Sequence, residues 1–170
     1  FLATDEPRWA QTSFDPESAT VQVHTRPALE DREWTGHLTA VLRSRPDADP
    51  EEAAFSPDAI RGRCGREHSR ERCYEYLRTI GLDYGPMFQG IQRVWQGDRE
   101  SLGVVELPEA LAGEEADYLF HPALLDACLQ VVIPADEDFD RRDGGLYLPC
   151  EIERVQLLRR PGRRVWVHAR

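Results

Sequence analysis

Apolar and polar residues alternate along several stretches of the chain, the pattern of β-strands that have one buried face. Residues 9–14 and 20–25 alternate in this way, and the turn-forming sequence Asp15-Pro16 follows the first of them. Residues 9–25 are therefore predicted to form a β-hairpin. Further strands are predicted at residues 33–42, 91–96, 101–107, 146–158 and 165–169.

Residues 69–80 show the spacing of an amphipathic helix instead. Ser69 is a favourable N-cap, and Gly81 is of the residue type that commonly follows the end of a helix. Apolar side chains recur at intervals of three and four residues and form one stripe. The stripe consists of Cys73, Tyr74, Leu77 and Ile80.

The most apolar segment of the chain is residues 120–134, FHPALLDACLQVVIP. Pro122 suits the first turn of a helix, where its missing N–H is not needed. The residues after it are apolar on nearly every side, so we predict a central helix that is buried on most of its surface.

Two polar residues, Asp126 and Gln130, interrupt this apolar helix. Their i, i+4 spacing places them on the same side. A buried carboxyl group is costly unless it is paired or protonated. The residues alone leave three interpretations open: a hydrogen-bonded structural acid, an ordinary exposed helix, and a catalytic acid.

Composition excludes several classes of function. The net charge of −10 argues against a general role in binding nucleic acids or anionic membranes, and no apolar run has the length of a membrane span. The four cysteines show neither CxxC spacing nor pairing with histidine, so we expect a cytoplasmic protein without a disulfide framework or a metal site.

Residues 81–91 form a second distinctive stretch. Gly85, Pro86 and Gly90 predict a tight loop. In the simplest interpretation the loop is a structural turn in which Tyr84 and Phe88 are packing residues.

Two motifs in these stretches together resemble the dehydratase domains of modular polyketide synthases. The sequence His121-Pro122-Ala123-Leu124-Leu125-Asp126 is similar to the motif of their catalytic aspartate, and Gln130 matches the residue that holds it. The sequence Tyr84-Gly85-Pro86-Met87-Phe88 is similar to their YGPxF motif, in the same order along the chain. Of a third motif, Leu-Pro-Phe-x-Trp, the chain has Leu148 and Pro149 but Cys150 and Ile152 in place of the aromatic residues.

The resemblance implies an α+β hotdog fold, in which an antiparallel sheet wraps around a central helix, and two such units form a double hotdog. On this basis residues 1–46 are the closing strands of an N-terminal hotdog. Residues 47–68, rich in proline and acidic residues, are a linker with a short helical turn after Ser56 and Pro57. Residues 69–170 are a C-terminal hotdog without its final strands, and both ends of the chain are expected to be cut.

The resemblance also implies a function, the elimination of water from a 3-hydroxyacyl thioester on an acyl carrier protein. Asp126 is then the catalytic acid, with support from Gln130, His121 and Tyr84. The residues implied to bind substrate are Gly85, Pro86, Phe88, Leu125, Leu148 and Pro149. No cofactor is expected to bind directly, because the substrate is carried on the phosphopantetheine of the carrier protein.

The family's catalytic base is a histidine in a His-x-x-x-Gly-x-x-x-x-Pro motif, which this sequence lacks. We therefore expect half of an active site, completed by a missing N-terminal hotdog segment. The expected partners are that segment, the carrier protein, neighbouring synthase domains and a second copy in a homodimer. Two alternatives stay open. One is a catalytically silent module that binds acyl chains or has a structural role, and the other is a double-hotdog cyclase of the product-template or pyran-forming type.

Overall fold

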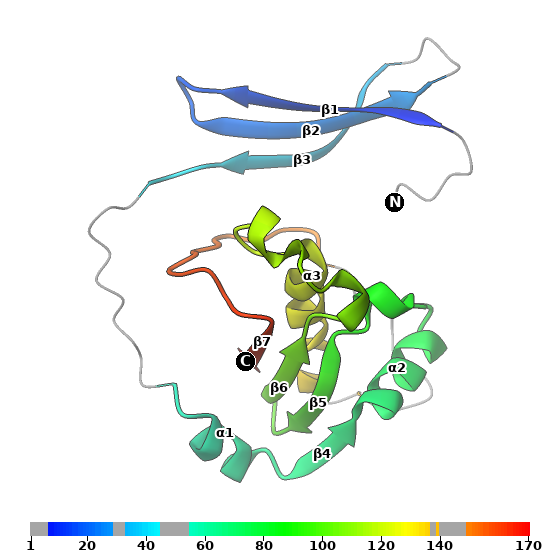
Figure 1. The fold of residues 1–170 in the computed structure, drawn as a ribbon, viewed down its shortest axis with the longest axis vertical. Helices are drawn as coiled ribbons and strands as arrows, with labels where there is room; N and C mark the ends of the chain where they lie inside the picture. The colour runs from blue at the N-terminus through cyan, green and yellow to red at the C-terminus, as the bar shows by residue number, and fades with distance from the viewer. Residues whose placement is uncertain (1–6, 29–32, 45–54, 137–138, 140–148) are drawn as a thin grey trace. The chain divides into compact units, whose positions relative to one another are not determined.

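The structure is a computed structural model that describes residues 7–28, 33–44, 55–136, 139 and 149–170. The chain forms two compact units, residues 1–50 and residues 51–170 (Figure 1). None of the helices in these described ranges combines the length and the apolar composition needed to cross a membrane.

The first unit is a three-stranded antiparallel sheet in the order β1-β2-β3. Its strands are β1 (Arg8–Asp15), β2 (Thr20–Pro27) and β3 (Thr35–Val41). Phe14 lies opposite Val21 in the hairpin, and a bulge between β2 residues 23 and 24 shifts the pairing with β3. The strands predicted at residues 9–14, 20–25 and 33–42 are thus present.

The second unit contains a four-stranded antiparallel sheet in the order β4-β5-β6-β7. Its strands are β4 (Arg66–Ser69), β5 (Ile91–Gln96), β6 (Ser101–Glu106) and β7 (Arg164–Ala169). Its helices are α1 (Pro57–Arg63), α2 (Arg70–Thr79) and α3 (Pro122–Gln130), and short 3₁₀ turns lie at η1 (Pro86–Phe88), η2 (Glu109–Leu111), η3 (Glu114–Asp117) and η4 (Ile133–Ala135). Helix α2 begins and ends as its sequence predicts, because the Ser69 hydroxyl accepts the Arg72 N–H and Gly81 has a φ of 91°.

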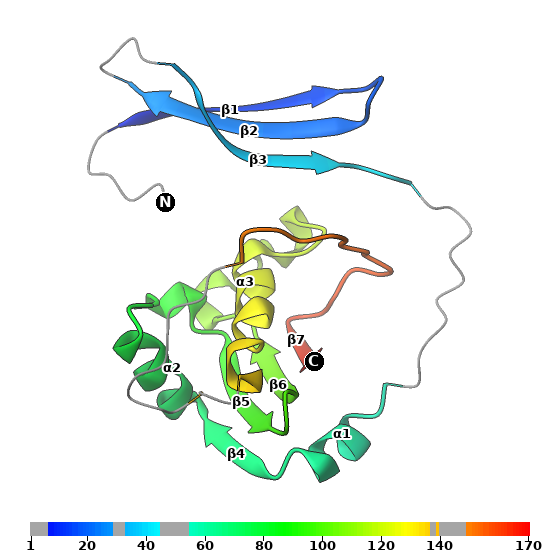
Figure 2. The same ribbon diagram turned by 180° about the vertical axis from the view of Figure 1, so that it is seen from behind.

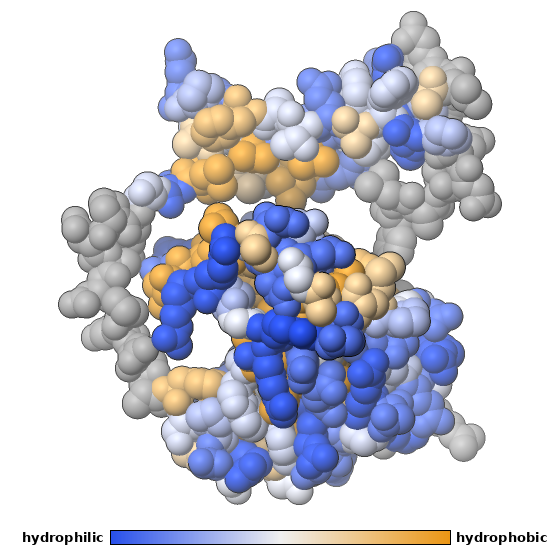
Figure 3. Space-filling model, viewed as in Figure 1, coloured by the Kyte–Doolittle hydropathy of each residue, from blue (hydrophilic) through white to orange (hydrophobic). Residues whose placement is uncertain are grey.

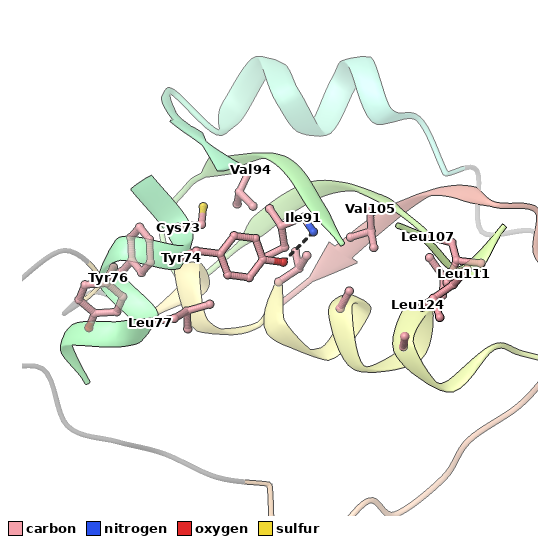
Figure 4. Packing of buried hydrophobic residues seen from close by; sticks show 14 residues of the cluster. Cys73, Tyr74, Tyr76, Leu77, Ile91, Val94, Val105, Leu107, Leu111 and Leu124 are labelled. Carbon is pink, nitrogen blue, oxygen red and sulfur yellow. Dashed lines mark hydrogen bonds between the residues drawn. The ribbon is translucent and has the colours of Figure 1, made fainter. Parts of the chain in front are cut away.

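Helices α2 and α3 pack on one face of this sheet, and α3 lies along β5 and β6 (Figures 1 and 2). Figure 4 shows the side chains of α2 and α3 meeting those of the two strands in a single apolar cluster. Residues of β6 alternate between the two faces, so Val105 joins this cluster while Leu102 and Val104 face the other way.

The opposite face of the sheet is covered by α1, which corrects the predicted linker. Of residues 47–68, those from 57 onward form α1 and most of β4. Ile60 and Cys64 are buried in a second cluster with Trp95. The segment is ordered because these apolar side chains find partners on the sheet, and residues 47–54 lie outside the described residues.

Two further predictions differ from the structure. The central helix was predicted to run to residue 134 but ends at Gln130, since Pro134 cannot donate the next i→i−4 hydrogen bond. The strand predicted at residues 146–158 is absent from residues 149–158. In the described chain this segment pairs with no strand, and apolar side chains such as Val155 are exposed. Residues 146–148 lie outside the described residues. The strands predicted at 91–96, 101–107 and 165–169 are present as β5, β6 and β7.

Helix α3 is also more exposed than predicted. Leu125 is 37% exposed, Leu129 41% and Val132, just beyond the helix, 54%. These three residues recur at intervals of four and three, so they form one apolar stripe. Figure 3 shows exposed apolar surface, in orange, on each of the two units.

A cluster of charged groups joins α1, the β5–β6 turn and β7. Glu100 accepts hydrogen bonds from Arg63 Nε at 2.7 Å and from His168 Nε2 at 2.7 Å. Its side chain is only 11% exposed, whereas that of Arg63 is 52% exposed. The Arg63 guanidinium, followed by the His168 contact, lowers the pKa of Glu100 from 4.5 to about 2.

This cluster predicts a loss of stability in acid. A carboxyl group whose folded pKa is depressed stabilises the fold above its unfolded pKa, and that contribution disappears as the pH falls through the folded value. We expect the part of the unfolding free energy due to Glu100 to be constant above about pH 4.5 and to decrease between about pH 4.5 and 2. Urea unfolding of the wild type and of Glu100→Gln measures this, because the variant should be less stable at neutral pH and should lack this acid-dependent component. The prediction would be contradicted if the unfolding free energies of the two proteins differed by the same amount at every pH down to about 2.

Candidate active site

The loop between α2 and β5 is fixed in place by its own hydrogen bonds. Gly85 precedes the turn η1, and its carbonyl accepts the Phe88 N–H at 2.9 Å. The Gln89 side chain donates to the Tyr84 carbonyl at 2.8 Å. Pro86 provides a preset φ at the first position of η1. The predicted tight loop is therefore present.

Asp126 and Gln130 lie on the side of α3 that faces this loop. Gln130 Nε2 donates to Asp126 Oδ2 at 2.7 Å and to the Phe88 carbonyl at 3.0 Å. The contact expected from the i, i+4 spacing is thus present, and the same amide connects α3 to η1. Gln130 is buried, whereas Asp126 is partly exposed, next to the exposed Leu125 and Leu129.

Tyr74 is a member of this network that the sequence reasoning missed. Its hydroxyl donates to Gln130 Oε1 at 3.0 Å and accepts the Ile91 N–H at 2.9 Å. From its position in an apolar stripe, Tyr74 was interpreted as a packing residue. The spacing along the sequence gives no signal of the bond, because 56 residues separate Tyr74 from Gln130.

Tyr84 lies close enough to Asp126 for the two groups to influence each other electrostatically. Burial raises the pKa of Tyr84, and the negative charge of Asp126 raises it further. The phenol is therefore protonated at neutral pH. Its ring packs edge-on against that of Tyr74, with the ring centres 6.3 Å apart.

His121 has a different place. It is the N-cap of α3, and its Nδ1 accepts the Ala123 N–H at 3.2 Å. His121 therefore caps the start of the helix. Its buried Nε2 lies 3.5 Å from Glu114 Oε2, and its ring contacts Tyr118. Among the described residues, no hydrogen bond joins His121 to Asp126 or Gln130.

The residues predicted to bind substrate fall into three groups. Phe88 and Leu125 are 42% and 37% exposed. Leu125 directly precedes Asp126 in α3, and the carbonyl of Phe88 accepts the Gln130 amide. Gly85 and Pro86 shape the loop through their backbone. Pro149 is exposed in an irregular segment, and Leu148 lies outside the described residues.

The arrangement can hold a carboxyl group in one orientation. Oδ2 of Asp126 is occupied by the Gln130 amide, while Oδ1 accepts no hydrogen bond from the described residues. Such a group can deliver a proton from its free oxygen and leave behind a carboxylate that remains hydrogen bonded.

A family model described as the polyketide synthase dehydratase N-terminal domain matches residues 52–170. The chain is 26% identical over 170 residues to polyketide synthase PksN of Bacillus subtilis, covering 98% of this chain and 3% of PksN. It is 39% identical over 113 residues to the pikromycin polyketide synthase component PikAII of Streptomyces venezuelae, covering 63% of this chain and 3% of PikAII.

The fold is similar to that of the dehydratase domain from the CurK module of curacin polyketide synthase. The TM-score is 0.77 at 29% identity, and the match covers 95% of this chain and 56% of the CurK domain. Two inactive mutants of the CurK dehydratase, one with a histidine replaced by phenylalanine and one with an aspartate replaced by asparagine, match with a TM-score of 0.78 at 28% identity, over 96% of this chain and 57% of theirs. The sheet with its central helix is accordingly a hotdog fold, as the resemblance implied.

Proposed function

Because the chain belongs to the polyketide synthase dehydratase family, we propose that it eliminates water from a 3-hydroxyacyl thioester to give an enoyl thioester, with Asp126 as the general acid. The hydrogen bond between Gln130 Nε2 and Asp126 Oδ2 carries this proposal, because it presents a carboxyl group with one free oxygen on the loop-facing side of α3. The inactive CurK mutant with asparagine in place of an aspartate supports the proposal, since its inactivity indicates that a protein of the same fold needs this carboxyl group.

Elimination requires two groups. A base takes the proton from the carbon next to the thioester carbonyl, the C–O bond at the third carbon breaks, and the departing hydroxyl leaves as water with the proton from Asp126. The electron pair of the broken C–H bond becomes the new double bond, so atoms and charge balance.

The base is proposed to be a histidine of a segment that the CurK dehydratase has and these 170 residues do not cover. The chain spans 57% of the CurK mutants' length, and one of those inactive mutants lacks a histidine. On this proposal Asp126 and the Gln130 amide that binds it form one half of the site, and the complete domain is a double hotdog.

The substrate is proposed to arrive on the phosphopantetheine of an acyl carrier protein. The relatives that match are polyketide synthases of which this chain covers about 3%, which leaves ample sequence for a carrier and neighbouring domains. The exposed apolar side chains of Phe88 and Leu125 beside Asp126 suit the acyl part of such a substrate.

The experiment that tests this function uses the domain that contains residues 1–170 together with the histidine-bearing segment. A 3-hydroxyacyl chain on a carrier protein is supplied, and the product is followed by mass spectrometry. We expect the loss of one water and an enoyl product. An unchanged substrate that remains bound would indicate a silent module, and a cyclic ether would indicate a cyclase. Either result would replace the proposed function.

A further inference from the structure

A buried tyrosine hydroxyl lies behind the proposed acid, outside its direct contact. Tyr74 is 6% exposed and projects from α2 toward Ile91 at the start of β5 (Figure 4). Its hydroxyl contacts groups from α3 and β5 at the same time. Such a group is not needed to fill the core, because a phenylalanine ring would occupy nearly the same volume.

The direction of each hydrogen bond follows from the groups involved. The Ile91 N–H can only donate, so the Tyr74 oxygen accepts from it. The single hydroxyl proton points to Gln130 Oε1 at 3.0 Å, the nearer of its two acceptors, because the Phe88 carbonyl lies 3.5 Å away. The oxygen end of the Gln130 amide therefore faces Tyr74. Its nitrogen end then faces Asp126 Oδ2 and the Phe88 carbonyl, and both amide protons are used.

We propose that Tyr74 is a positioning residue for the dehydration reaction. Tyr74 fixes the Gln130 amide, and the amide in turn determines which oxygen of Asp126 keeps the transferable proton. The inference rests on the proposed function, in which Asp126 is the acid. Tyr74 itself touches neither Asp126 nor the reacting atoms.

The network favours one orientation of the Gln130 amide. If the amide turned over, its oxygen would face the Phe88 carbonyl and, once the proton has been transferred, the Asp126 carboxylate, and neither of these can donate a hydrogen bond. Without the Tyr74 hydroxyl, Gln130 Oε1 has no donor, and the buried amide is free to shift away from its present position. Burial also raises the pKa of Tyr74, which keeps the hydroxyl protonated as a donor throughout the physiological range.

The consequence for catalysis concerns the proton of Asp126. Since Oδ2 accepts the Gln130 N–H, the proton of the acid form resides on Oδ1, which no described residue occupies. After transfer, the same N–H stabilises the carboxylate that forms. Losing this bond therefore leaves the carboxylate without its donor and lets the acid turn away from the departing hydroxyl, so the maximal rate should fall.

Tyr74→Phe in the complete domain tests this inference, with Tyr76→Phe as the control. Tyr76 is equally buried on the same helix, at 6% exposure, but packs against Phe139 outside the network. We expect Tyr74→Phe to lower kcat about 10-fold, a moderate effect for a misplaced catalytic group, with KM little changed. No loss of kcat is expected in the control.

A double-mutant cycle with Gln130→Met separates positioning from general support of the fold. If Tyr74 acts through Gln130, then Tyr74→Phe should cause no further loss of kcat once the amide is gone. Independent, multiplicative losses, or a Tyr74→Phe variant with normal kcat, would overturn the inference. Should Tyr74→Phe not fold, 3-fluorotyrosine at position 74 keeps the ring and alters the strength of the donor. It should change kcat relative to 3-fluorotyrosine at position 76, and equal kcat values for the two proteins would equally overturn the inference.

The two proposals fail in different ways. If Asp126→Asn remains active, the proposed function fails, whatever Tyr74→Phe does. If Asp126→Asn is inactive and Tyr74→Phe behaves as Tyr76→Phe does, the function stands and only the positioning role is lost.

Discussion

Asp126→Asn is expected to lower the dehydration rate by about 100- to 10,000-fold, the usual contribution of general acid catalysis. Asparagine has nearly the same shape, and its side-chain oxygen can still accept the Gln130 N–H, so the network around α3 should survive. What the variant lacks is a proton that it can transfer to the departing hydroxyl. The measurement is single-turnover conversion of a carrier-bound 3-hydroxyacyl chain, with circular dichroism to verify the fold.

Asp83→Asn provides the matched control. Asp83 lies next to Tyr84 and undergoes the same exchange of a carboxyl group for an amide, but its exposed carboxylate pairs with Arg78 at 3.2 Å. We expect its turnover to equal that of the wild type. If Asp126 is only a structural acid, the opposite pattern should appear, with reduced stability and largely retained activity. Turnover of Asp126→Asn within a few-fold of the wild type would remove this residue from the mechanism.

The elements that the sequence predicted correctly are those with a strong local signal. The hairpin strands β1 and β2 and the helix α2 have clear periodicity, and Ser69 and Gly81 mark the two ends of α2. The pair Asp126 and Gln130 was also predictable, because the i, i+4 geometry of a helix brings the two side chains together wherever the helix lies.

The elements that were missed depend on contacts between distant parts of the chain. Strand β4 has a largely charged sequence that resembles a linker, yet it is an edge strand, and an edge strand tolerates charged side chains because its pairing uses the backbone. The exposure of Leu125 and Leu129 was missed because an apolar sequence does not show which side of a helix finds a partner. The role of Tyr74 was missed because the spacing of apolar residues along a helix does not indicate which groups a tyrosine hydroxyl binds.

The contact between α3 and the sheet depends on a close approach at Gly90. A Cβ atom added to this residue would lie 2.7 Å from the Ala127 Cβ and 3.1 Å from the Glu106 carbonyl oxygen. Neither neighbour is the end of a flexible side chain, so the helix or the strand would have to move. Gly90 also lies between Phe88, whose carbonyl binds Gln130, and Ile91, whose N–H binds Tyr74. The same close approach therefore sets both the core packing and the geometry of the site.

Gly90→Ala is accordingly expected to destabilise the second unit. Overpacking a tight core costs about 1–3 kcal/mol, whereas replacing glycine by alanine otherwise stabilises a protein by about 0.4–1 kcal/mol through the unfolded chain. The steric cost is larger, so the net loss should be about 1–2 kcal/mol, measurable by urea unfolding, and dehydration should slow because the loop moves away from Gln130. Gly62→Ala is the control of opposite sign, since Gly62 lies within α1 and an added Cβ would meet no atom within 4 Å. A gain in stability for both variants would show that α3 and the sheet have room to separate at Gly90. The proposal that close packing at Gly90 holds the acid in place would then be wrong.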